Sequence, residues 1–182
     1  MGAPHNPERY GERWPEDRIQ AWIPVLQTFK DYVVFSGGFA WHFMSPVGHP
    51  EYKHAHDHKD VDIFVTPHMV GTVIGLLKRI GFRKVQTRFD RLPSDEDFRR
   101  YEWYPKGNPV KLVIDMFVKN VPTMTINDKW KVVEPRTLLS YYGNIHSSDK
   151  CWAVQAATRL LASGVTPEGL VGREELVQQP RG

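Results

Sequence analysis

The sequence predicts an α+β (α/β) protein in which a mixed β-sheet is flanked by helices. Three observations support this class: short apolar runs with the two-residue alternation of strands, longer segments with helical spacing, and Gly or Pro between them. The chain has 182 residues, the length of about one domain. We therefore expect a single domain over residues 1–182, with an N-terminal arm at 1–18 and a C-terminal tail at 165–182.

The first predicted elements are a helix, a strand and a second helix. Apolar residues recur at helical spacing from Arg18 to Lys30, and Pro24 predicts a kink or a late start. The run from Tyr32 to Phe35 is typical of a buried strand, which ends in a Ser-Gly-Gly turn. A helix is expected to begin within Phe39 to Met44.

The second strand carries two carboxylates on one side. Residues from Asp60 to Val65 alternate, so that Asp60 and Asp62 point to one face and three aliphatic residues point to the other. Thr66 suits the cap of a following amphipathic helix, and Gly81 suits its end in a left-handed turn.

The remaining elements continue the mixed pattern of strands and helices. Strands are expected at 82–89, 99–104, 110–118 and 130–133, and helices at 135–142 and 148–163. The strand at 110–118 is almost wholly apolar but contains Asp115, which is costly to bury without a partner.

Composition narrows the classes of protein. The single cysteine cannot form an internal disulfide, and the N-terminal residues lack the apolar segment of a secretory signal. No stretch approaches the roughly 20 apolar residues of a membrane helix. We expect a cytoplasmic protein without membrane attachment, and the net charge of +3 permits a polyanionic partner without requiring one.

Four histidines precede the acidic strand: His49, His54, His56 and His58. The segment HAHDH is similar to the His-x-His-x-Asp-His run of zinc hydrolases of the metallo-β-lactamase type, but it lacks one intervening residue and the downstream ligands. A catalytic zinc site needs about three protein ligands held by further contacts. The alternative is a solvated polar loop, in which only His58 is close enough to Asp60 to contact a ligand of the carboxylates.

The aspartates suggest a cation site. Asp60 and Asp62 point the same way, and such like charges usually have a cation between them, for which hard oxygen ligands favour Mg²⁺. Asp115 is a candidate third ligand. The alternatives are a solvated strand face for the first two, and for Asp115 a salt bridge to Lys111 or to an arginine.

In these motifs the sequence resembles the nucleotidyltransferase superfamily with the DNA polymerase β-like fold. The signature is a glycine pair after a strand, here Gly37-Gly38, then Asp60-Val61-Asp62, then Asp115 on a later strand. The segments GGFAWHF and HKDVDIFV are similar to lincosamide/aminoglycoside-type enzymes. The segment VVEPRTLLSYY resembles the short C-terminal helical part of AbiEii-toxin-type members.

The resemblance implies transfer of an NMP from an NTP such as ATP to an acceptor hydroxyl on a small molecule, an RNA or a protein. It implies catalytic and metal-binding roles, with Mg²⁺ or Mn²⁺, for Asp60, Asp62 and Asp115. It further implies nucleotide binding by Ser36, Gly37 and Gly38, with Lys59 as the nearest cation where the family has an arginine. The alternative is a catalytically silent module of the same fold that binds nucleic acid or protein.

Overall fold

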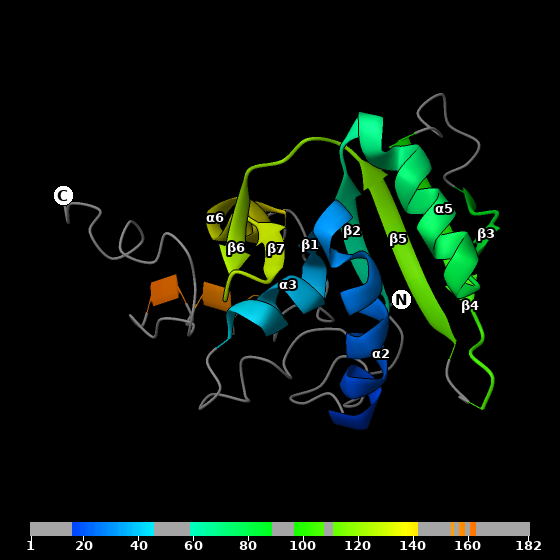
Figure 1. Ribbon diagram of the computed structural model, residues 1–182. Coiled ribbons are helices and arrows are strands. Elements are labelled where there is room, and N and C mark those ends of the chain that lie inside the picture. Colours follow the sequence, from blue (N-terminus) through cyan, green and yellow to red (C-terminus); the bar gives the residue numbers. More distant parts are fainter. Residues whose placement is uncertain are drawn as a thin grey trace.

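The protein is described from a computed structural model, shown in Figure 1. The structure describes residues 16–45, 59–88, 97–107, 111–141, 154, 157–158 and 161–162. In this part of the chain it is an α+β protein with a seven-stranded mixed sheet and four α-helices, so the predicted class is confirmed at this level. The strands are β1 (Val34–Ser36), β2 (Val61–Val65), β3 (Arg83–Val85), β4 (Phe98–Trp103), β5 (Leu112–Val118), β6 (Thr123–Ile126) and β7 (Trp130–Val133). The helices are α2 (Glu16–Phe29), α3 (Gly37–Met44), α5 (Val70–Ile80) and α6 (Pro135–Ser140), with 3₁₀ turns at Lys30–Tyr32 and Pro67–Met69.

The sheet has the strand order β3-β4-β5-β2-β1-β7-β6. β2 runs parallel to β5 and β1 runs parallel to β7, whereas the other four neighbouring pairs are antiparallel. Because a parallel pair needs a long crossover, α5, β3 and β4 all lie in the chain between β2 and β5. The topology therefore places β2 and β5 side by side at the centre, where they carry the candidate aspartates.

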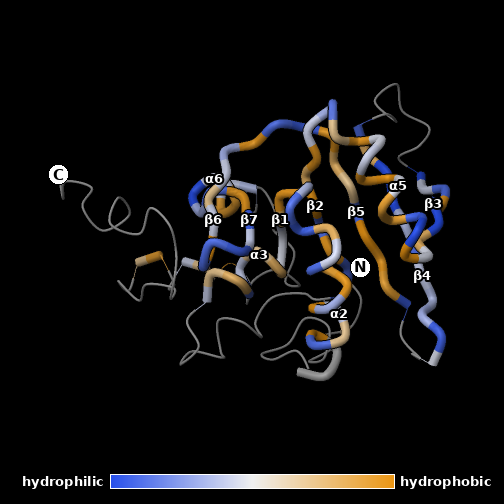
Figure 2. Tube along the Cα trace, in the orientation of Figure 1, coloured by the Kyte–Doolittle hydropathy of each residue, from blue (hydrophilic) through white to orange (hydrophobic). Residues whose placement is uncertain are grey.

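The apolar faces of the strands and helices form one core. In Figure 1, α2 and α5 cross the same face of the sheet. On this face Trp22 of α2 stacks on Phe82, which follows α5, with ring centroids 6.4 Å apart. Trp22 also forms a T-shaped pair with Phe39 of α3, with ring centroids 6.1 Å apart. Val61, Ile63 and Val65 of β2 are fully buried here, as their alternation predicts, and Figure 2 shows β5 as an almost continuous hydrophobic strand.

Several boundaries differ from the predicted ones. The helix α2 begins at Glu16, inside the expected arm, and continues through Pro24, which lies on the exposed side where water can replace a lost backbone hydrogen bond. The strand expected over 82–89 is limited to β3. Residues 1–15 and the tail at 165–182 lie outside the described residues, as does most of the helix expected at 148–163, of which the described residues are helical.

The strand β6 is absent from the predicted elements. It forms a hairpin with β7 through a turn in which Asn127 and Asp128 have φ of 52° and 53°. Asn and Asp adopt this left-handed conformation more readily than other side chains, so the Asn-Asp pair is a local signal for the hairpin. Among the described residues, no helix has the length and apolar character needed to cross a membrane.

Candidate functional site

Strand register builds a transverse row of polar side chains across four strands. Ser36 of β1 pairs with Asp62 of β2, Asp62 pairs with Asp115 of β5, and Asp115 pairs with Arg100 of β4. Directly paired residues point to the same face of a sheet. The four side chains therefore lie on one face, opposite to the face that α2 and α5 cover.

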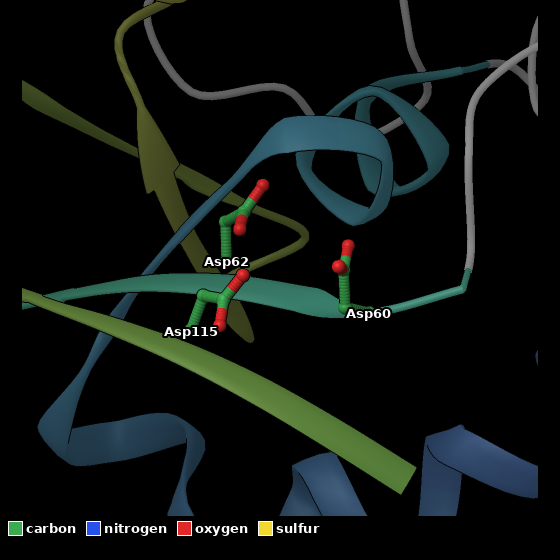
Figure 3. A group of neighbouring side chains, drawn as sticks. All are labelled: Asp60, Asp62 and Asp115. Atoms are coloured by element: carbon green, nitrogen blue, oxygen red, sulfur yellow. The ribbon is translucent and has the colours of Figure 1, made fainter. Parts of the chain in front are cut away.

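The three aspartates meet on this face. Asp60 precedes β2 by one residue and lies on the same side as Asp62, and one oxygen from each of Asp60, Asp62 and Asp115 lies within 4.8 Å of the others. Figure 3 shows the three carboxylates on the same side of the two strands, beside the turn that leads into α3. We call these three residues the acidic cluster.

The donor set of the acidic cluster suits a hard divalent cation. Asp115 is buried, whereas Asp60 and Asp62 are half-buried, so a cation bound to them could also keep water molecules as ligands. Mg²⁺ and Mn²⁺ prefer carboxylate oxygens, and Mg²⁺ keeps several water molecules in protein sites. In the described part of the chain, this is the one group of three acidic, His or Cys residues with such spacing.

An arginine holds the most buried carboxylate. Arg100 Nε donates to Asp115 Oδ1 at 2.7 Å, and Arg100 Nη2 donates to Asp115 Oδ2 at 2.9 Å. The hydrogen bond to Asp115 raises the pKa of Arg100 above its usual value, so the guanidinium stays charged. The structure thus contains the ion pair between Asp115 and an arginine that was the alternative to a role as third metal ligand. The Lys111 alternative is wrong, because Lys111 Nζ lies 2.8 Å from Glu102 Oε1 instead.

Arg100 is the site residue that sequence reasoning missed. The strand predicted at 99–104 contains Arg99 and Arg100 in succession, so alternation places one on each face of the sheet. Which of the two meets Asp115 depends on the register between β4 and β5. That register is a long-range property.

The glycine turn is built around Asp62. Gly37 has a φ of +59°, and a Cβ at this position would overlap Asp62 Oδ2. Gly37 therefore meets two requirements that other residues do not, the left-handed backbone and the close approach of a carboxylate. Ser36 is buried at the N-cap of α3 without a side-chain capping bond, and Gly38 lies in the first turn of the helix.

The remaining residues proposed from the sequence precede Asp60 in the chain. Lys59 is exposed and directly precedes Asp60. The histidine segment with His49, His54, His56 and His58 lies outside the described residues.

An aromatic row borders the acidic cluster on the same face. Phe64 and Phe98 each contact Phe117, with ring centroids 5.4 and 5.2 Å apart, and Tyr141 lies 6.0 Å from Phe64. Phe64 is two residues beyond Asp62, and Phe117 is two residues beyond Asp115. The cluster thus combines a charged site with an adjoining apolar surface, an arrangement suited to an organic anion bound through a cation.

Comparisons of the chain with protein-family models, with curated proteins and with solved structures found no match.

Proposed function

We propose that this chain is a metal-dependent nucleotidyltransferase of the DNA polymerase β-like superfamily, which transfers an NMP from an NTP to an acceptor hydroxyl. The observation that carries the proposal is the meeting of Asp60, Asp62 and Asp115 within 4.8 Å on adjacent parallel strands. Gly37 opens α3, and a Cβ at this position would overlap Asp62 Oδ2. A glycine turn, a paired-aspartate strand and a third aspartate are the parts that the sequence resemblance calls for.

The proposed reaction forms a bond between the acceptor oxygen and the α-phosphorus of the NTP and breaks the bond from that phosphorus to the oxygen that bridges to the β-phosphate. Pyrophosphate is released, and the proton of the acceptor hydroxyl passes to bulk water. Such phosphoryl chemistry depends mainly on positioning and on neutralising charge. Asp60 and Asp62 would hold Mg²⁺ or Mn²⁺, which when bound supplies positive charge to the triphosphate. The backbone N–H groups in the first turn of α3, at Gly37 and Gly38, would bind phosphate oxygens.

Asp115 would orient the acceptor hydroxyl. Each of its oxygens already accepts a hydrogen bond from Arg100. A carboxylate oxygen has a second lone pair, so Asp115 can still accept a hydrogen bond from the acceptor. The bidentate pair with Arg100 fixes the orientation of the Asp115 carboxylate, so Asp115 can in turn orient the hydroxyl.

A second candidate, a catalytically silent module that binds nucleic acid or protein, is favoured by the same Arg100–Asp115 pair. The pair satisfies both oxygens of Asp115 without a metal ion. The two functions can be distinguished by NTP binding, which requires a divalent cation only if the protein is the enzyme.

The deciding experiment measures NTP binding by calorimetry with Mg²⁺ and with EDTA. We expect Mg²⁺-dependent binding in the wild type and its loss in Asp60→Ala and in Asp62→Ala, with the fold intact by circular dichroism. Asp31→Asn is the matched control, because the Asp31 side chain is 75% exposed in a separate ion pair with Lys30. Binding that is indifferent to Mg²⁺ and to both cluster substitutions would contradict the proposal and favour the silent module.

The acceptor class is tested by incubating labelled NTPs with small hydroxylated compounds, tRNA and protein. In the same assay, simultaneous Ala substitutions of His49, His54, His56 and His58 are expected to lower activity less than Asp62→Ala does. Complete loss of activity in the histidine variant, with wild-type activity that depends on added zinc, would reverse this ranking and indicate a zinc enzyme.

A further inference from the structure

Arg100 adds a positive charge beside the acidic cluster, although an arginine cannot itself be a ligand of a cation. Its guanidinium holds both oxygens of Asp115 in a bidentate pair, at 2.7 and 2.9 Å. The Asp115 side chain is 10% exposed and that of Arg100 is 34% exposed, so solvent screens this pair only in part. Such a planar fork fixes the orientation of a carboxylate as well as its charge.

The net charge of the acidic cluster together with Arg100 affects how strongly a cation is attracted. With all groups ionised, three carboxylates and one guanidinium leave a formal charge of −2, which one divalent cation balances. Without Arg100 the charge would be −3, and the attraction for a divalent cation would increase. The repulsion among the carboxylates in the cation-free protein would increase as well.

We propose that Arg100 is a positioning residue that sets the cation affinity of the acidic cluster: it holds Asp115 in place and weakens the binding of the divalent cation. This inference rests on the proposed function, since it assumes that the cluster binds a cation. Removal of Arg100 is then expected to lower the stability of the cation-free protein and to raise its affinity for the cation. A purely structural arginine would not produce the second effect.

The test compares Mn²⁺ affinity, measured by electron paramagnetic resonance without nucleotide, with melting temperature in EDTA. Arg100→Met is expected to melt at a lower temperature and to bind Mn²⁺ about tenfold more tightly, the effect of one unit charge on a divalent ion across about 6 Å of water. Arg100→Lys keeps the charge and should retain a Kd within about threefold of wild type.

Two further variants separate charge from structure. Lys111→Met is the matched control, because it removes a cation that pairs with Glu102 on the same strand as Arg100, and it should leave the Mn²⁺ affinity unchanged. The double variant Arg100→Met with Asp115→Asn has the formal charge of the wild type and no unpaired buried carboxylate. Its Mn²⁺ Kd should return to within about threefold of wild type. This variant keeps the test decisive if Arg100→Met does not fold.

The outcomes distinguish the inference from the proposed function. A wild type that binds no Mn²⁺ contradicts both. A wild type that binds Mn²⁺ through Asp62, together with an Arg100→Met variant of equal or weaker affinity, overturns the role of Arg100 alone. If Arg100→Met does not fold, a double variant with an affinity far from wild type overturns it.

Discussion

Substituting Gly37 by Ala tests the link between the glycine turn and the acidic cluster. The residue has a φ of +59°, and the new Cβ would overlap Asp62 Oδ2 and lie 3.2 Å from Asp62 Cγ. The overlap involves the end of a side chain, so we expect Asp62 to rotate rather than the backbone to move. The substitution should therefore impair cation binding more severely than it impairs folding.

The loss of stability has two parts. A left-handed backbone costs about 1–2 kcal/mol for a residue with a Cβ, and forcing the Asp62 side chain off its rotamer costs about 0.5–1.5 kcal/mol. Together these give a destabilisation of about 1.5–3.5 kcal/mol. The double variant Gly37→Ala with Asp62→Ala removes the overlapping atoms, so the two substitutions should couple by about 1 kcal/mol.

Urea denaturation of the single and double variants measures these free energies, and calorimetry with Mg²⁺ and NTP measures binding. Gly75→Ala is the matched control, because the nearest atom to its Cβ would be Arg79 Nη2 at 3.9 Å and the residue lies within α5. That control should gain about 0.5–1 kcal/mol. A Gly37→Ala variant that loses less than about 0.5 kcal/mol, or that binds Mg²⁺ and NTP like the wild type, would refute the reasoning.

Two other predictions concern ionised side chains. In EDTA the melting temperatures should decrease in the order wild type, Asp115→Asn, Arg100→Met. Asp115→Asn loses the ion pair with Arg100 but relieves repulsion within the acidic cluster, whereas Arg100→Met loses the same pair and leaves a buried carboxylate beside two others. Differential scanning calorimetry checks the order, and a reversed order of the two variants contradicts it. Burial opposes ionisation of Glu134, but hydrogen bonds from Arg136 N, Thr137 N and Thr137 Oγ1 outweigh it and lower the pKa of this N-cap of α6 from its usual value of 4.5. The lowered pKa means that Glu134 stabilises the protein above pH 4.5 and loses this effect as the pH falls through the folded-state pKa. Glu134→Gln should therefore cost about 1 kcal/mol at pH 7 and progressively less in acid, and a difference independent of pH in urea denaturation would contradict this.

Local patterns in the sequence were sufficient for the elements whose signals are local. The alternation from Val61 to Val65 predicts which side chains of β2 are buried, because successive side chains of a strand point to opposite faces. Gly81 ends α5 as expected, with a φ of 128° and its N–H bonded to Leu77 O. The start of α5 was less well predicted, since a 3₁₀ turn at Pro67–Met69 precedes it.

The acidic cluster was partly predictable for the same reason. Asp60 and Asp62 share a face of one strand by alternation alone, and an ionised residue in the apolar run around Asp115 requires a partner. The sequence could therefore name the three aspartates and the need for a counter-charge. The sequence could not identify the positively charged side chain that pairs with Asp115.

Only the tertiary structure decided how these residues meet. Asp115 lies beside Asp62 because β5 runs parallel to β2, and it meets Arg100 because β4 pairs with β5 in one register. A shift of that register by one residue would turn Arg100 to the other face of the sheet and leave Asp115 without it. The register depends on packing between segments far apart in the chain, whereas sequence periodicity reports only which face each residue takes within its own strand.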